Sequence, residues 1–293
     1  MPSPSKSADN PADRVLRVRL REAIRFPDLT QRRALKLSAI PHYTARAHFG
    51  AWHRRLGRPN FEEFTGVFTP LFFVDIETMD VPLAHHSSLQ VRGATFLAKT
   101  LDATGHIDHL VREGQHTVLL REGNLDTIVA RVRLINVFTR YDLDPARRRV
   151  TALPADMGLG PGPSRVSELP TVETLLPQER PPDFTDAATP VWHYGQTDPN
   201  RHINGMEYLR MMELFVADNL QPRGHDLRRL YFSRARLVYR KPCFCGEGYR
   251  RAAWLRSEAP LVVSGAFYKA SDPPGARPAV AVELTLSPHD DVN

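Results

Sequence analysis

A proline-rich stretch divides this chain of 293 residues into two parts. Between Thr151 and Pro190 there are eight prolines and three glycines, which interrupt every hydrophobic periodicity and exclude a long helix or strand. With 42% hydrophobic and 25% charged residues, the chain has the composition of a globular protein with a sizeable core. We therefore expect two folded units joined by a linker.

Both parts show the same order of predicted elements, a short strand, a helix and four longer strands. In the second part Met206, Leu209 and Met212 recur at helical spacing. The first part has a predicted strand at 14–20, a helix at 45–56 and strands at 67–76, 89–99, 109–120 and 128–138. The second has a strand at 191–194, a helix at 204–220 and strands at 230–239, 248–255, 261–268 and 279–286. The repeat predicts an α+β protein in which an antiparallel sheet with one long helix is duplicated.

Charge and apolar patterning limit the functions open to the chain. A formal net charge of +6 favours acidic partners, but the densest basic stretch, 14–33, mixes seven arginines with Glu22 and Asp28, so we expect no nucleic-acid partner. No apolar run approaches the roughly 20 residues that cross a bilayer, and the N-terminus lacks the apolar stretch of a secretory signal. No residues have the spacing of metal ligands, and two cysteines are too few for a disulfide framework. We expect a cytoplasmic protein with reduced thiols, no metal and no membrane partner.

The segment from Asp198 to Glu213 carries the most chemically useful side chains. Four polar residues alternate before helical periodicity begins: Asp198, Asn200, His202 and Asn204. Such a loop can turn several side chains toward one cleft, while the N-terminus of the following helix offers unpaired N–H groups and a partial positive charge. The same residues also suit a turn and a helix cap, so a structural role for them stays open.

The pattern D-x-N-x-H-x-N-x-x-x-Y, from Asp198 to Tyr208, resembles the active-site segment of the acyl-carrier-protein thioesterases and of the wider hydroxybenzoyl-CoA-thioesterase-like hotdog family. A second stretch, Leu237 to Cys243, resembles the strand segment L-E-Y-R-R-E-C of the plant enzymes. The resemblance covers 191–286 and extends to the first part only through its order of elements.

This resemblance implies a double hotdog, with two antiparallel sheets each wrapped around a long helix. The units should lie side by side with continuous sheets, because a lone half exposes a sheet edge. We expect an N-terminal extension, partly disordered, at 1–40, a first hotdog domain at 41–150, a linker at 151–190 and a second domain at 191–293. Assembly into a homo-oligomer through the sheets stays open.

The resemblance also implies an enzyme that hydrolyses acyl thioesters of coenzyme A or of an acyl carrier protein, without a cofactor, in fatty acid or polyketide metabolism. Two positions depart from the family pattern. Gly205 stands where the family has a second Asn, and Pro242 replaces the acidic residue thought catalytic in the plant enzymes. Because proline cannot accept a proton, the acid or base work falls to Asp198, His202 or Glu213.

Asp198 is the expected nucleophile or general base, and Asn200 and His202 are expected to position the attacking group or polarise the thioester. Glu213 is the alternative helix carboxylate, of the kind that some hotdog thioesterases use. Backbone N–H groups near the start of the helix would form the oxyanion site. The remaining residues are assigned to substrate binding: Asn204, Gly205 and Tyr208. Since the loop 40–45 has no equivalent of Asp198, we expect only the second site to be active.

Three other functions stay open. Dehydration of a 3-hydroxyacyl thioester needs a histidine base facing an acid, and the pairing available is His85 or His86 with Asp198. Acyl transfer or decarboxylation would use a similar scaffold. A non-catalytic acyl-binding protein is the third, because Pro242 removes the family's acid.

Overall fold

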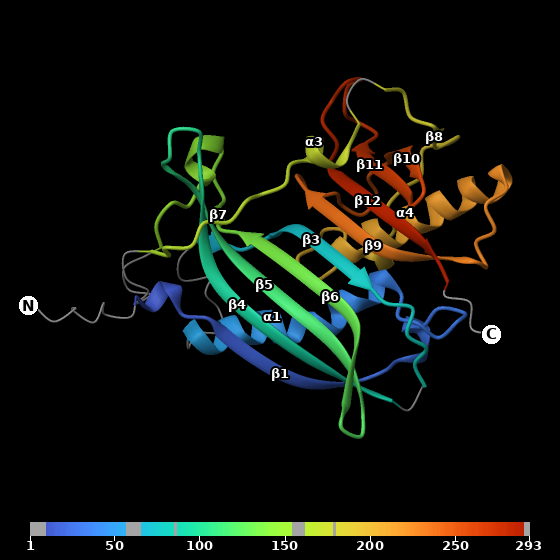
Figure 1. The fold of residues 1–293 in the computed structure, drawn as a ribbon. Helices are drawn as coiled ribbons and strands as arrows, with labels where there is room; N and C mark the ends of the chain where they lie inside the picture. Colours follow the sequence, from blue (N-terminus) through green and yellow to red (C-terminus); the bar gives the residue numbers. More distant parts are fainter. Residues whose placement is uncertain (1–9, 57–65, 85–86, 154–161, 178–179, 290–293) are drawn as a thin grey trace, which may run out of the picture.

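The computed structural model describes residues 10–56, 66–84, 87–153, 162–177 and 180–289. Ten strands form one antiparallel sheet in the order β1-β4-β5-β6-β3-β9-β12-β11-β10-β8 (Figure 1). Each half of the chain contributes five of these strands. In both halves the second of the five along the chain lies at the centre of the ten-stranded sheet. The two inner strands, β3 and β9, pair antiparallel, for example Val74 with Leu237, and so join the halves.

The first half consists of α1 and five strands of the sheet: α1 (Ile40–Leu56), β1 (Leu16–Ala23), β3 (Leu71–Thr78), β4 (Ser88–Leu101), β5 (Ile107–Glu122) and β6 (Leu125–Val137). A small separate pair, β2 (Val67–Phe68) with β7 (Thr139–Arg140), lies beside it. The second half consists of α4 and the other five: α4 (Gly205–Leu220), β8 (Phe184–Thr185), β9 (Leu230–Tyr239), β10 (Tyr249–Glu258), β11 (Leu261–Lys269) and β12 (Val280–Pro288). A one-turn helix, α3 (Val172–Leu175), lies between the halves in sequence.

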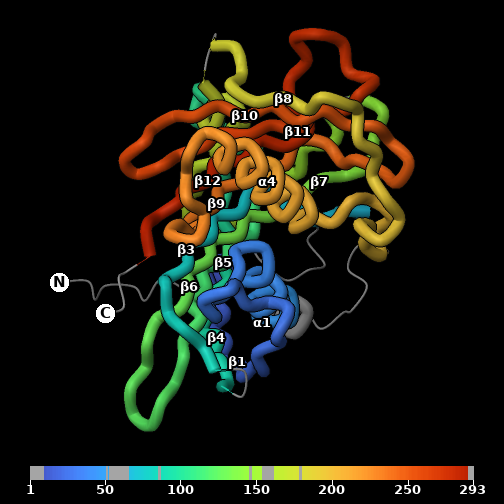
Figure 2. The backbone as a smooth tube through the Cα atoms, turned by 90° about the vertical axis from the view of Figure 1, so that its right-hand side faces the viewer, coloured from blue at the N-terminus to red at the C-terminus, as the bar shows by residue number. Residues whose placement is uncertain are grey.

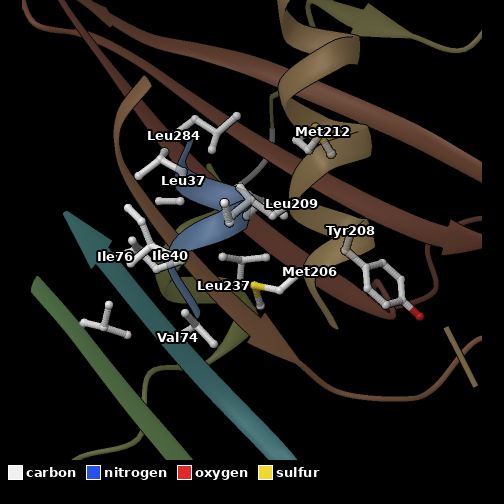
Figure 3. Packing of buried hydrophobic residues seen from close by; sticks show 14 of the residues in the cluster. Leu37, Ile40, Val74, Ile76, Met206, Tyr208, Leu209, Met212, Leu237 and Leu284 are labelled. Carbon is white, nitrogen blue, oxygen red and sulfur yellow. The ribbon is translucent and has the colours of Figure 1, made fainter. Parts of the chain in front are cut away.

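The two long helices lie on the same face of the sheet, α1 over β1 and β4 and α4 over β9 and β12 (Figure 2). Their facing side chains belong to one hydrophobic core shared by both halves. In Figure 3, Leu37, in the 3₁₀ turn before α1, and Ile40, the first residue of α1, lie between Leu209 of α4 and Ile76 of β3. The apolar faces of both helices therefore pack into a single core. None of the described helices is long and apolar enough to cross a membrane.

The structure corrects two expectations about the sheet. The sheets of the two halves are continuous, as expected, and so form one sheet in place of the two, because the inner strand of each half takes the other as its hydrogen-bonding partner. The stretch Val191–Tyr194 is no strand: Val191 makes one bridge to Gly248, and a 3₁₀ turn begins at Tyr194. The outer strand of the second half is β8, which lies in the proline-rich stretch and is held by Asp186, whose carboxylate accepts hydrogen bonds from Arg251.

Candidate functional site

A closed loop at the start of α4 holds the predicted catalytic residues. A bridge between Thr197 and Ile203 closes the loop, and the backbone N–H of Asp198 donates to the carbonyl of His202 at 3.0 Å. Arg201 turns the chain with a φ of 65°, in the left-handed region that few side chains tolerate. The turn therefore brings positions 198 and 202 side by side.

Inside this loop the side chains of Asp198 and His202 face each other. Asp198 Oδ1 lies 3.6 Å from His202 Nδ1 and accepts a hydrogen bond of 2.8 Å from the backbone N–H of Asn200. The carboxylate is 18% exposed and the imidazole 37%, so the pair is partly desolvated but reachable from solvent. Such a pair can hold and deprotonate a water molecule. The Asn200 side chain is exposed beside it.

The start of α4 fixes the roles of Asn204 and Gly205. Asn204 caps the helix, since its Oδ1 accepts from the N–H of Met206 at 2.9 Å and its own N–H donates to the carbonyl of Gln196 at 2.9 Å. Among the described residues nothing occupies the N–H of Gly205, which leaves that group for an incoming oxyanion. A Cβ at position 205 would lie 3.2 Å from the hydroxyl oxygen of Tyr239, which donates to the Gly205 carbonyl. A side chain at position 205 would therefore require the Tyr239 hydroxyl to shift by a few tenths of an ångström.

Tyr208 and Glu213 lie away from the loop opening. The Tyr208 hydroxyl accepts a hydrogen bond of 3.1 Å from the N–H of Cys243, and burial raises the pKa of Tyr208. Glu213 is at the junction with the first half, where burial raises its pKa to about 8 against the smaller effects of a hydrogen bond with Ser38 and the charge of Lys36. No contact within the described part of the chain joins Glu213 to the Asp198–His202 pair.

The sequence matches no family model and no curated protein. Three solved structures share the architecture over nearly their whole length. The 12:0-ACP thioesterase from Umbellularia californica is 16% identical, with a TM-score of 0.63 and coverage of 93% of this chain and 94% of that chain. A putative oleoyl thioesterase from Lactobacillus plantarum is 15% identical, with a TM-score of 0.64 and coverage of 96% and 100%. An acyl-ACP thioesterase from Bacteroides thetaiotaomicron is 15% identical, with a TM-score of 0.62 and coverage of 92% and 98%.

This chain has the double hotdog fold of the thioesterases. The likeness is confined to the fold, because fewer than one residue in five is shared. The strand orders of the two halves agree with it, since both hotdogs have the same topology and meet through their second strands.

Sequence reasoning missed a set of hydrogen-bonded side chains that links the segment before the loop to α4. Gln196 donates from Nε2 to the carboxylate of Glu207 at 3.4 Å, and Glu207 also accepts from Arg210 at 2.6 Å. The three-residue spacing of Glu207 and Arg210 was a signal for an ion pair on the helix surface. Nothing in the sequence marked Gln196, whose position depends on the 3₁₀ turn before the loop.

Two other features lie apart from the loop. His85 and His86, the alternative histidine bases, are outside the described residues. A groove of about 800 Å³ crosses the opposite face of the sheet, and six of its lining residues are arginines: Arg17, Arg19, Arg92, Arg131, Arg133 and Arg234. None of the residues that line this groove belongs to the segment 198–213. We place the candidate site at the loop because the paired reactive groups are there, and not in the groove.

Proposed function

We propose that this double hotdog is an acyl-thioester hydrolase whose active site is the loop at the start of α4. The observation that carries the proposal is the pairing of Asp198 and His202, 3.6 Å apart, in a closed loop that ends at a helix N-terminus. A base and an oxyanion donor within one short segment are the two groups that thioester hydrolysis requires. The shared fold of the three thioesterases supports the same reaction class.

In the proposed reaction, Asp198 accepts a proton from a water molecule as the water oxygen attacks the thioester carbonyl carbon. His202 and Asn200 hold the water and the thioester in place. The N–H of Gly205 donates to the oxyanion, and the partial positive charge of the helix N-terminus favours the same charge. The carbon–sulfur bond then breaks, the thiolate takes up the proton, and the free acid leaves.

We also propose the division of the chain into an extension at 1–40, domains at 41–150 and 191–293, and a linker at 151–190. The outer strand of each domain comes from the segment that precedes it in the chain. It is β1 for the first domain and β8 for the second. The net charge of +6 favours an acidic partner, and we propose that this partner is the acyl carrier, either coenzyme A or an acyl carrier protein.

A substrate panel tests the function. The purified protein is incubated with acyl-CoA and acyl-carrier-protein substrates of several chain lengths, and both free thiol and product mass are followed. Hydrolysis predicts thiol release in step with free acid. A new double bond without thiol release indicates dehydration, and binding with neither product indicates an acyl-binding protein; either outcome rejects the hydrolase.

A further inference from the structure

The outer face of the sheet, away from α1 and α4, has a covered end and an open end. Val74 and Ile76 of β3 point into the core beneath the helices, so the side chains that alternate with them, such as Phe73, point outward. One end of this face is apolar and is covered by α3, whose Val172 and Leu175 pack against Phe73 and its neighbours. The groove of about 800 Å³ lies at the other, open end. A ligand can therefore reach the groove without displacing α3.

Strand pairing arranges the outward side chains of the groove in two rows across the sheet. The first row runs through directly paired residues of six strands: Arg19, Arg92, Thr117, Arg131, Glu77 and Arg234. The second row lies beside it and runs through five strands: Arg17, Ala94, Gln115, Arg133 and Asp75. Side chains that pair directly in this way are about 5 Å apart at their Cβ atoms. The charges of the groove can therefore be compared strand by strand.

These charges are balanced toward β9 but not at β1. Three of the six arginines form ion pairs with carboxylates of the same face: Arg234 with Asp75 at 2.7 Å, Arg131 with Glu77 at 3.2 Å and Arg133 with Glu113 at 2.8 Å. Arg92 pairs with Asp126 and donates from Nε to Oε1 of Gln90 at 2.7 Å. Arg17 and Arg19 have no carboxylate partner in the described part of the chain. The β1 end of the groove therefore carries two uncompensated positive charges.

An open position lies among the arginines at this end. Arg19 faces Arg92 directly across β1 and β4, and like charges in this arrangement destabilise a sheet unless an anion lies between them. In the second row the neighbour of Arg17 is Ala94, whose methyl group fills little of the space between the longer side chains. Two polar side chains of β5 border the same position: Gln115 and Thr117. A compact anion above Ala94 can therefore be reached by all three arginines.

We propose that the β1 end of the groove binds a compact, phosphate-bearing ligand between Arg17, Arg19 and Arg92. Guanidinium groups donate paired hydrogen bonds that match the oxygens of a phosphate group, whose charge would offset the two uncompensated arginines. The volume is that of a small-molecule site, for which about 300 to 1,000 Å³ is usual. A long polyanion such as nucleic acid fits less well, because beyond Arg92 it would meet the carboxylates of Asp75 and Glu77.

This site is separate from the proposed active site. No residue that lines the groove belongs to the segment 198–213, and the groove lies on the face of the sheet that α4 does not cover. The ligand is therefore not the thioester that reacts at the loop, and the inference does not rest on the proposed function.

Binding of inorganic pyrophosphate to the whole protein gives the first test. Calorimetric titration at about 0.15 M salt is expected to show one site, with weaker binding of inorganic phosphate and progressive loss as more salt is added. Saturating pyrophosphate should also raise the urea midpoint, because it binds the folded state. Absence of binding overturns the proposal. Tighter binding of a DNA duplex, with the duplex displacing pyrophosphate, would assign the groove to nucleic acid and overturn it as well.

Arginine variants locate the site. Arg17→Gln and Arg19→Gln should each weaken pyrophosphate binding by about tenfold, since each loses charge-assisted hydrogen bonds. Arg21→Gln is the matched control, because it removes the same charge from the same face of β1 at a position that does not line the groove. Its binding should change by less than about twofold. Equal losses in all three variants would indicate general attraction to positive charge and would reject the site.

A substitution at Ala94 tests the position of the anion directly. Ala94→Glu keeps every arginine but puts a carboxylate where the phosphate group is expected, so pyrophosphate binding should disappear. The same carboxylate gives Arg17 an ion-pair partner across the two strands, so the urea midpoint without ligand should not fall. Pyrophosphate binding that persists in a folded Ala94→Glu variant contradicts the proposal. If that variant does not fold, the comparison of Arg17→Gln and Arg19→Gln with Arg21→Gln decides.

Discussion

Asp198 is the residue at which a catalytic and a structural role can be separated. Asp198→Asn keeps an oxygen that can accept from the N–H of Asn200, but it loses the negative charge and the basicity. A general base contributes a rate factor of about 10² to 10⁴, so turnover should fall by that much. The free energy of unfolding should change by less than about 1 kcal/mol, since the turn is preserved.

Steady-state turnover and urea unfolding of the same preparation measure the two effects. Asp218→Asn, an exposed carboxylate on α4, is the matched control and should leave both unchanged. Smaller losses are expected for Asn200→Ala and His202→Ala, because these residues position the reacting groups. Near-full activity of all three site variants and of Glu213→Gln would mean that the loop is only a structural turn.

Glu213 should make stability depend on pH. Its pKa is about 8 in the folded protein, against an ordinary value of 4.5, so the folded state retains the proton to higher pH. Its contribution is complete below pH 4.5 and is lost as the pH rises to 8, with a slope of at most about 1.4 kcal/mol per pH unit. Glu213→Gln should remove this slope from the pH dependence of urea unfolding. An unchanged slope in the variant would show that the carboxylate titrates normally.

At the scale of single elements, the cap of α4 is the feature most open to test. Asn204→Ala removes the acceptor for the N–H of Met206 and should cost about 1 kcal/mol in the free energy of unfolding. Asn204→Asp keeps the acceptor and should restore most of the stability. If Asn204 binds substrate as well, KM will rise in Asn204→Ala beyond any change in kcat; an unchanged KM limits the residue to capping.

Sequence periodicity predicted the long elements well because their apolar positions face one core. The strand β9 has the predicted bounds, and α4 begins one residue later than predicted, after its cap. Periodicity could not find β8, because it has only two residues. Its place in the sheet is stabilised by the ion pair of Asp186, the next residue, with Arg251 of β10, which is distant in sequence. The loop from Asp198 to Asn204 was visible as a pattern, whereas the burial of Glu213 depends on how α4 meets the first half.

For the whole molecule, the shared core predicts that both halves unfold together. The three tryptophans report on the halves separately, since Trp52 lies in the first and Trp192 and Trp254 in the second. In a Trp52→Phe background, fluorescence therefore follows the second half alone. Adding Leu89→Ala removes a buried side chain of the first half and should cost about 2 to 5 kcal/mol.

If the halves are one cooperative unit, the second-half tryptophans will show the full loss as a lower urea midpoint. An unchanged midpoint would show that the halves unfold independently. The pairing of β3 with β9 and the contact of Leu37 and Ile40 with α4 favour the cooperative outcome.

The outermost strand β1 also affects how the molecule behaves at high concentration. Its outward side chains include Arg17, Arg19 and Arg21, while its backbone pairs on one side with β4. A second copy adding to this strand would set arginines against arginines at a spacing of about 5 Å. Like-charge repulsion therefore discourages growth into ribbons or fibrils from this end, and β8, at the other end, offers only two residues as a template. Three arginines that contribute to the net positive charge of the chain thus also oppose strand addition at this end of the sheet.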